Sequence, residues 1–194
     1  MNRTATIRRA TRETDIALTL NLDGTGRATI ASGIGFLDHM ITSLTLHAGW
    51  DLELTCQGDL QVDDHHTAED CALALGQAFN KALGTRQDIV RFGSAFAPLD
   101  EALSRAVVDL ASRPFCAVDL QLQREMLGAI ACENIEHFFQ SFATEGRFCC
   151  HLDVLKGTND HHKSEASFKA LALAMRQALS TTSGGSIPST KGVL

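Results

Sequence analysis

The 194-residue sequence has little proline, no long hydrophobic run and no excess of positive charge. No apolar stretch approaches the roughly 18 residues that would suggest a membrane-spanning helix, and residues 1–15 lack the hydrophobic segment of a signal peptide. The formal net charge of −6 is opposite in sign to the charge that attracts proteins to phosphate backbones or anionic lipid. We therefore expect a cytoplasmic protein that binds neither nucleic acid nor membrane.

The composition also gives no sign of disorder or of a disulfide framework. With only 3 prolines and 15 glycines, the chain has neither a collagen-like nor a low-complexity composition. The 6 cysteines form no Cys-x-x-Cys pair, and we interpret them as reduced structural residues. A chain of this length can bury most of its apolar surface without a metal or a disulfide. Stability alone therefore demands no cofactor.

The chain contains an internal repeat. The run Asp-His-His-Thr-Ala-Glu at residues 64–69 recurs as Asp-His-His-Lys-Ser-Glu at residues 160–165, an offset of 96 residues. A single histidine precedes each copy: His39 lies 26 residues before the first pair and His137 lies 24 residues before the second. Each copy is followed by a segment rich in alanine and leucine that ends in a turn. We therefore interpret the chain as two copies of one unit within one compact domain, residues 1–88 and residues 89–194.

Hydrophobic periodicity predicts the elements of each unit. Apolar residues at three- and four-residue spacing indicate helices at residues 36–48, 65–83, 132–145 and 161–179. Alternating runs indicate strands at residues 16–22, 28–31, 50–54, 105–110, 117–122 and 148–152. Asp63 or Asp64 is expected to cap the second helix, and Gly84 to end it. Each unit is then β-β-α-β-α, an α+β fold in which helices cover one face of a small antiparallel or mixed sheet and the units pack helix layer to helix layer.

The repeated His-His-x-x-Glu motif supplies candidate metal ligands. On a helix, residues three and four positions apart share a face, so either histidine can point with the glutamate at one ion. Vicinal histidines are about 100° apart around the helix axis, so one pair should serve two metals. With the two single histidines, the inventory gives three histidines and one glutamate for each of two equivalent sites. The candidate ligands are His39, His65, His66, Glu69, His137, His161, His162 and Glu165.

Other interpretations of this motif exist. A single pair would be read more readily as helix-starting histidines bonded to caps, but the symmetric duplication favours ligands. Imidazole and carboxylate without thiolate suit Mn, Fe, Zn, Ni or Co, and four protein ligands leave an octahedral ion two positions for substrate or water. A dinuclear metallohydrolase would use the same ligand types but would recruit Asp38, Asp64 and Asp160 as ligands. A metal-storage protein would need no phosphate-binding cations.

Six segments resemble the imidazoleglycerol-phosphate dehydratase family of histidine biosynthesis. They are GFLDHM at residues 35–40, HAGWDL at 47–52, DHHTAED at 64–70, ENIEHFF at 133–139, NDHHKSE at 159–165 and PSTKG at 188–192. The match covers essentially the whole chain and lacks an additional phosphatase domain, so it is similar to the monofunctional form. The resemblance implies two ferredoxin-like units with helices between two small sheets. It also implies two Mn²⁺ ions per active site and a homo-oligomer of 24 subunits with active sites at subunit junctions.

The resemblance further implies a reaction and roles for individual residues. The expected reaction is dehydration of imidazole glycerol phosphate to imidazole acetol phosphate, in which two ions on the ring nitrogens favour an imidazolate that expels the neighbouring hydroxyl. Glu13 is the implied acid–base group, with Glu69 and Glu165 in the catalytic set. The implied substrate contacts are Glu13, His39, His47, Arg91, Arg113, Ser189 and Lys191, of which the last four would hold the phosphate. From the residues alone, Glu13 reads more readily as a solvated charge, whereas His47 reads equally well as an exposed helix-end histidine.

Overall fold

The computed structural model describes residues 3–182, 187 and 189–191. The first repeat contains β1 (Thr4–Ala10), β2 (Thr14–Asn21), β3 (Ala28–Ala31), α1 (Gly35–Ala48), β4 (Asp51–Gly58) and α2 (His65–Leu83). The second contains β5 (Phe92–Leu99), β6 (Ala102–Asp109), β7 (Phe115–Asp119), α3 (Cys132–Gly146), β10 (Cys149–Lys156) and α4 (Asp160–Ala178). A small hairpin of β8 (Met126–Leu127) and β9 (Ile130–Ala131) precedes α3.

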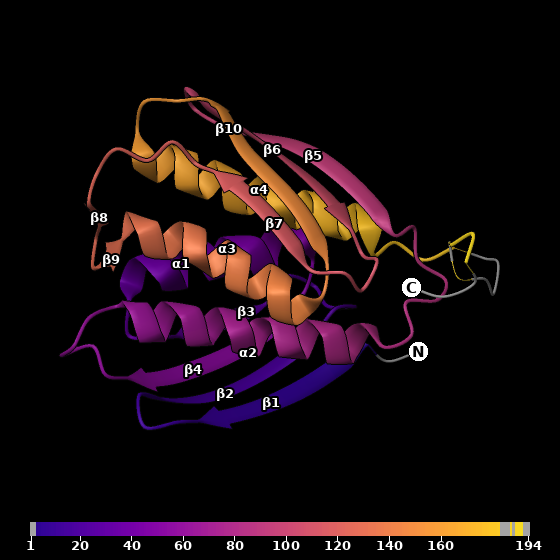
Figure 1. Cartoon of the computed structure of the whole chain (residues 1–194), viewed down its shortest axis with the longest axis horizontal. Helices are drawn as coiled ribbons and strands as arrows, with labels where there is room; N and C mark the ends of the chain where they lie inside the picture. The colour runs from indigo at the N-terminus through magenta and orange to yellow at the C-terminus, as the bar shows by residue number, and fades with distance from the viewer. Residues whose placement is uncertain (1–2, 183–186, 188, 192–194) are drawn as a thin grey trace.

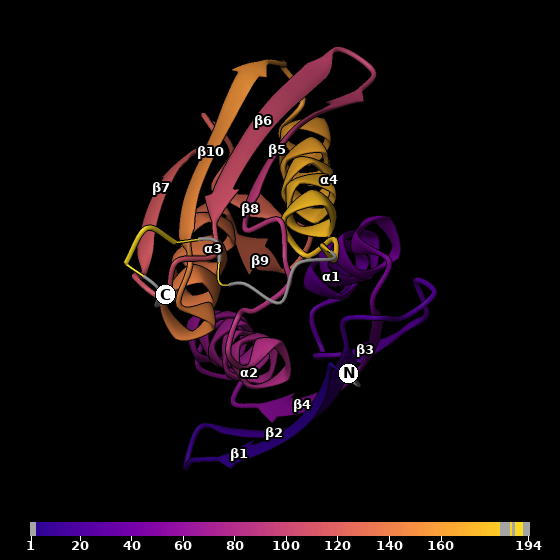
Figure 2. The same cartoon turned by 90° about the vertical axis from the view of Figure 1, so that its right-hand side faces the viewer.

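The two repeats form sheets with the same topology. The strand orders are β1-β2-β4-β3 and β5-β6-β10-β7, and in each sheet the last pair is parallel while the others are antiparallel. The four helices lie between the two sheets, with α2 against α3 and α1 against α4 (Figures 1 and 2). The predicted α+β fold, with helix layer packed on helix layer, is therefore confirmed.

The structure adds one strand at the start of each repeat, so each unit is β-β-β-α-β-α. Both added strands, β1 and β5, lie at the edge of a sheet, where few side chains are buried and the apolar alternation is weak. In β5, Gly93 faces α4. A glycine is needed there because a Cβ would lie 1.9 Å from the carbonyl oxygen of Ala174. The other buried residue of β5 is the small Ala97, so the strand gives only a weak hydrophobic signal.

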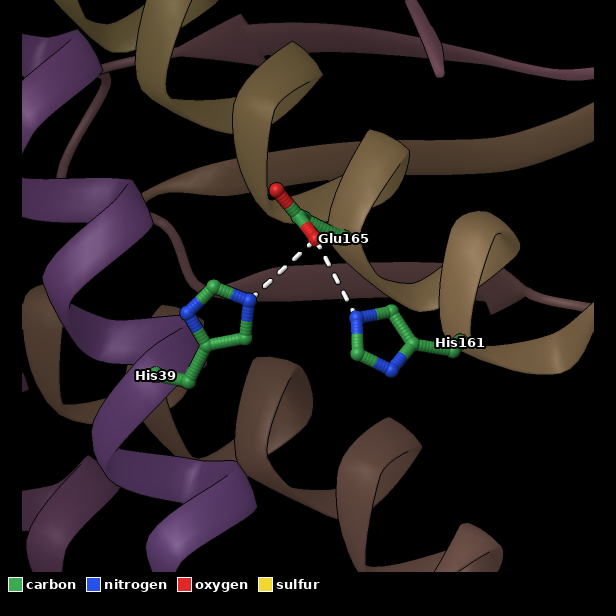
Figure 3. Close-up of side chains that lie close together, drawn as sticks. All are labelled: His39, His161 and Glu165. Atoms are coloured by element: carbon green, nitrogen blue, oxygen red, sulfur yellow. Dashed lines mark hydrogen bonds and ion pairs between the residues drawn. The ribbon is translucent and has the colours of Figure 1, made fainter. Parts of the chain in front are cut away.

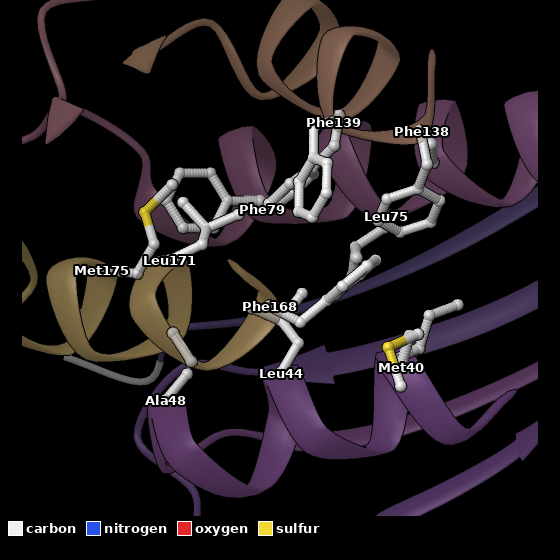
Figure 4. Packing of buried hydrophobic residues seen from close by; sticks show 14 of the residues in the cluster. Met40, Leu44, Ala48, Leu75, Phe79, Phe138, Phe139, Phe168, Leu171 and Met175 are labelled. Carbon is white, nitrogen blue, oxygen red and sulfur yellow. The ribbon is translucent and has the colours of Figure 1, made fainter. Parts of the chain in front are cut away.

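The core is formed where the four helices meet. Phe138 and Phe139 of α3 lie against Phe168 of α4, and the ring centroids of Phe139 and Phe168 are 4.4 Å apart (Figure 4). Gly76 allows α2 to approach α3 closely, since a Cβ there would lie 2.9 Å from the carbonyl oxygen of Phe142. This shared core holds the two repeats in one orientation and so fixes the relative positions of their histidines.

The beginnings of α2 and α4 are held by polar contacts. Asp63 Oδ1 accepts a hydrogen bond from the backbone N–H of His65 at 2.9 Å, whereas Asp64, the residue before α2, bonds to the second repeat. Asn159 Oδ1 accepts from the backbone N–H of His161 at 2.9 Å. Each histidine pair therefore starts its helix from a fixed turn, and Gly84 follows the last residue of α2 as expected.

No helix in the described part of the chain has the length and apolar character needed to cross a bilayer. The cytoplasmic location expected from the sequence stays a prediction.

Candidate functional site

Six of the eight candidate ligands form two groups of three. The first group contains His39, His161 and Glu165, and the second contains His65, Glu69 and His137. In each group the donor atoms, one from each residue, lie within 4.8 Å of one another. Each group takes one histidine from α1 or α3 of one repeat and a histidine and a glutamate from α4 or α2 of the other. We call them the His39 group and the His65 group.

In the His39 group the carboxylate lies between two imidazoles (Figure 3). Glu165 Oε2 is 3.2 Å from His39 Nε2 and 3.3 Å from His161 Nε2. The other carboxylate oxygen, Oε1, is 2.7 Å from Lys169 Nζ, one turn further along α4. Burial raises the pKa of Glu165, but Lys169 and His39 together lower it by more, so the pKa lies below its usual value. The carboxylate is therefore held ionised.

The His65 group has a similar arrangement. Glu69 Oε1 is 3.1 Å from His137 Nε2, and Glu69 Oε2 is 3.8 Å from His65 Nε2. The His65 and His137 rings are stacked with centroids 5.1 Å apart. His65 Nδ1 is 2.8 Å from the side-chain oxygen of Asn134. As in the His39 group, Nε2 of both histidines faces the carboxylate.

The second histidine of each pair, His66 or His162, lies outside these groups. His66 Nδ1 donates to Asp59 Oδ2 at 3.0 Å, and His162 Nδ1 donates to Glu101 Oε2 at 2.7 Å. These carboxylates raise the pKa of each histidine, and the bond from His162 lowers the pKa of Glu101 to about 2. Vicinal residues on a helix point in different directions, which separates the two histidines of each pair as expected.

Two further predicted residues, Glu13 and His47, lie near charged residues of these groups or near their histidine neighbours. Glu13 is half exposed, and its Oε1 is 3.7 Å from His66 Nε2. Partly buried His47, near the end of α1, has a pKa lowered by burial and by the charge of Lys169, partly offset by Glu165. The charges of Lys169 and Glu165 therefore act on the His47 ring. Glu13 lies next to His66, which is outside both groups.

The predicted phosphate-binding residues surround a separate cavity. Arg91, Arg113, Ser189 and Lys191 line a cavity of about 320 Å³ together with Ala111, Ser112 and Thr190. Arg91 Nε donates to Asp109 Oδ1 at 2.7 Å, and this bond raises the pKa of Arg91. Two residues of the resembling tail, Pro188 and Gly192, lie outside the described residues.

This cavity, which we call the Arg91 cavity, and His161 of the His39 group lie at opposite ends of α4. The backbone N–H of Arg91 donates to the carbonyl oxygen of Ala178, the last residue of α4, whereas His161 is in its first turn. At 1.5 Å per residue the two positions are about 26 Å apart along the helix axis. Figure 1 shows the same separation, with the start of α4 and the segment that follows α4 on opposite sides of the molecule. One chain therefore does not bring the two sets of residues together.

The three aspartates that a hydrolase would need as metal ligands accept hydrogen bonds from backbone N–H groups instead. Asp38 Oδ1 accepts from the backbone N–H and the hydroxyl of Ser32, at 2.8 and 2.6 Å. Asp64 Oδ2 accepts from the backbone N–H of Ala131, and Asp160 Oδ2 from that of Arg124. None of the three belongs to either group in the described part of the chain. The candidate ligands that these groups offer are therefore histidine and glutamate.

Sequence reasoning missed several residues that contact the candidate ligands, among them Lys169, Asn134, Asp59 and Glu101. Helical spacing could have found two of them, because Lys169 lies four residues after Glu165 and Asn134 lies three before His137. Asp59 and Glu101 lie in loops after β4 and β5, where no periodicity relates them to the histidines.

The fold and these groups define a duplicated α+β protein with paired histidine–carboxylate groups, the donor type that divalent transition metals prefer. A model of the imidazoleglycerol-phosphate dehydratase family matches residues 32–175. The chain therefore belongs to the imidazoleglycerol-phosphate dehydratase family, and by class it is a hydro-lyase.

Relatives carrying the name of this family are similar over most of the chain. The imidazoleglycerol-phosphate dehydratase of Candida glabrata is 53% identical over 208 residues, which cover 98% of this chain and 99% of that protein. The Saccharomyces cerevisiae enzyme is 59% identical over 85% of this chain and 75% of its own length. The Phytophthora nicotianae protein is 57% identical over 99% of this chain, but this match spans only 42% of that protein.

Solved structures of the family have the same fold. The Staphylococcus aureus imidazoleglycerol-phosphate dehydratase superposes with a TM-score of 0.84 at 34% identity, covering 92% of this chain and 99% of that one. The Pyrococcus furiosus enzyme superposes with a TM-score of 0.82 at 34% identity, covering 97% of this chain and 100% of that one.

Proposed function

We propose that this chain catalyses the dehydration of imidazole glycerol phosphate to imidazole acetol phosphate in histidine biosynthesis, with divalent metal at the His39 and His65 groups. The observation that carries the proposal is the symmetry of these groups: each places a carboxylate beside two imidazoles and joins both repeats. Two Mn²⁺ ions per active site are expected, while Fe, Zn, Ni and Co share the preference for these donors.

The donor atoms fit such ions. In each group the Nε2 atoms of both histidines face the glutamate, so nitrogen lone pairs and a carboxylate oxygen can converge on one point. Three donors leave an octahedral ion room for a further protein ligand and for substrate. His66 and His162 are the candidate further ligands, and since they point out of the groups of their own chain, they would complete groups in neighbouring copies.

The Arg91 cavity supports the same assembly. Arg91, Arg113 and Lys191 would provide the positive charge, and Ser189 a hydroxyl donor, for the phosphate of the substrate. A separation of about 26 Å along α4 exceeds the reach of a substrate with one ring, three carbons and a phosphate. We therefore propose a homo-oligomer, of 24 subunits as the resemblance implies, in which the metal groups of one copy meet the cavity of another.

The proposed chemistry assigns a task to each residue. When bound, the two ions would favour the imidazolate form of the substrate ring, whose electrons can expel the neighbouring hydroxyl. Glu69 and Glu165 hold the histidine rings in place and supply negative charge. Glu13 is the candidate to take the proton from the adjacent carbon, because its exposed carboxylate can reach a substrate bound near His66. His47 would contact the substrate beside the His39 group.

Metal removal tests this function. The full chain, stripped with a chelator, should form no imidazole acetol phosphate, and added Mn²⁺ should restore the reaction. Glu69→Gln and Glu165→Gln should each lower kcat by more than the roughly 10- to 100-fold typical of losing an outer hydrogen-bond partner. Glu133→Gln, an exposed glutamate on α3 outside both groups, is the matched control and should retain activity. Full activity of the stripped protein would refute the proposal.

A further inference from the structure

The two metal groups have the same donors but different surroundings. In the His65 group, the Asn134 side chain joins His65 to Asp64. Asn134 Oδ1 is 2.8 Å from His65 Nδ1, and Asn134 Nδ2 donates to Asp64 Oδ2 at 2.9 Å. Asp64 Oδ2 also accepts from the backbone N–H of Ala131 at 2.7 Å, and Asn134 is 5% exposed. The contacts therefore form a partly buried chain, with Asn134 buried at its centre, from the backbone to the histidine ring.

This chain of contacts fixes the proton position on His65. An ionised Asp64 carboxylate can only accept, so the amide nitrogen of Asn134 must face it and the amide oxygen must face His65. An amide oxygen can only accept, so His65 carries its proton on Nδ1 and donates it to Asn134. The lone pair of His65 is then on Nε2, the atom that faces Glu69. The ring is held in the tautomer and orientation that a metal requires.

The His39 group has no such support at the corresponding position. Three residues before His39 stands Phe36, where Asn134 stands three before His137. The Phe36 ring meets the His161 ring edge-on, with centroids 5.1 Å apart. Within the described residues, His161 Nδ1 has no hydrogen-bond partner. The only side-chain hydrogen-bond partner that the described residues offer the His161 ring is Glu165, at 3.3 Å from Nε2, so no acceptor holds the proton on Nδ1 as Asn134 does for His65.

The glutamates also differ. Lys169 Nζ lies 2.7 Å from Glu165 Oε1, so part of the carboxylate charge in the His39 group is already neutralised. The residue at the corresponding position after Glu69 is Leu73, which carries no charge. A cation approaching Glu165 must compete with an ammonium group that Glu69 does not have.

We propose that Asn134, held by Asp64, is a positioning residue for His65, and that together with the Lys169–Glu165 pair it makes the two groups unequal. The His65 group binds divalent metal more tightly and fills first, and the His39 group fills second. This inference rests on the proposed function, because it takes both groups to be metal sites.

Titration of the metal-free full chain with Mn²⁺, followed by calorimetry, tests the inference. The wild-type protein should show two affinity classes. Asn134→Leu removes the amide with little change of volume and should weaken the tight class by about 10- to 100-fold while leaving the other class unchanged. Lys169→Met should instead tighten the weak class. Phe36→Leu, which removes no hydrogen bond, is the control and should leave the tight class unchanged.

The pattern across the variants separates positioning from a general loss of structure. Equal weakening of both classes by Asn134→Leu would overturn the proposal, as would a single affinity class in the wild type. If Asn134→Leu does not fold, Asn134→Ser removes the same amide and should give the same selective loss. A wild-type chain that binds no Mn²⁺ would refute the metal centre itself, whereas one that binds Mn²⁺ with a single affinity refutes only the inequality.

Discussion

His39 Nε2 on α1 lies 3.2 Å from Glu165 Oε2 on α4, although 126 residues separate them in the chain. The second repeat mirrors this contact, with His137 Nε2 on α3 lying 3.1 Å from Glu69 Oε1 on α2. Each group thus depends on both repeats, and neither repeat contains a complete group of its own. The duplication is therefore necessary for both histidine–carboxylate groups to form.

Lys191→Ala should raise the KM for imidazole glycerol phosphate and leave Mn²⁺ affinity unchanged, since the proposed partner of Lys191 is the substrate phosphate. Steady-state kinetics together with metal titration would separate the two effects. Lys156→Ala, on an exposed lysine at the end of β10, is the control. An unchanged KM would remove Lys191 from the site.

Two variants that are each impaired at a substrate concentration far below the raised KM of Lys191→Ala should complement each other if the proposed metal groups and the cavity of one site come from different copies. Lys191→Ala damages the cavity and Glu165→Gln damages the His39 group, so mixed assemblies would contain some sites with both parts intact. Co-expression of the two variants followed by an activity assay should therefore recover activity that neither variant has alone. No recovery, in assemblies shown to contain both variants, would mean that one copy supplies both parts.

In the Mn²⁺-loaded protein, the two ions of one active site should lie about 6 Å or more apart, because a bridging imidazolate adds its own width to two metal–nitrogen bonds of about 2.1 Å. No protein carboxylate should bridge them. A crystal structure with Mn²⁺ and a substrate analogue would measure the spacing. A carboxylate-bridged pair under about 4.5 Å would favour two-metal hydrolysis instead.

The buried ion pair at the start of α4 should make stability depend on pH. Lys163 Nζ donates to Asp160 Oδ1 at 2.9 Å, and both side chains are 3% exposed. Burial raises the pKa of Asp160, but the hydrogen bonds from Lys163 and from the backbone of Arg124 and Gln123 lower it by more, to below 3.8. A lowered carboxyl pKa contributes stability that is fully present above the unfolded-state value and is lost as the pH falls through the folded-state value.

Asp160→Asn should therefore lower the free energy of unfolding near neutral pH by about 3–5 kcal/mol, because it leaves Lys163 buried without its counter-charge. It should also flatten the decline of stability below pH 4. Urea unfolding of the metal-free protein at several pH values would measure both effects. Asp153→Asn removes an exposed pair with Arg105 and should cost at most about 1 kcal/mol. Equal losses in the two variants would contradict the assignment.

Gly93→Ala should destabilise the packing of β5 on α4. A Cβ at residue 93 would lie 1.9 Å from the carbonyl oxygen of Ala174, so strand and helix must move apart, at a cost of about 1–3 kcal/mol. Thermal unfolding would measure the loss. Gly35→Ala is the control, since a Cβ at residue 35 has no heavy atom within 4 Å among the surrounding described residues. Unchanged stability of Gly93→Ala would show that β5 can shift without cost.

The sequence by itself determined the repeat, the helices that carry the His-His-x-x-Glu motifs and the residue types of the His39 and His65 groups. These follow from local rules: helical periodicity fixes which side chains share a face, and vicinal histidines must diverge. The edge strands β1 and β5 were not predicted, because too few of their side chains are buried to give an alternating apolar pattern.

Tertiary structure alone decided which histidine meets which glutamate. His39 precedes the first motif in the chain, yet it meets Glu165 of the second, because each sheet buries one face under helices and α1 then packs against α4. The free energy gained by burying apolar surface depends on the area removed from water and not on how far apart the residues are in the sequence. For the same reason only the folded chain shows that the cavity lined by Arg91, Arg113, Ser189 and Lys191 lies about 26 Å along α4 from His161, because the backbone of Arg91 bonds to the last residue of that helix.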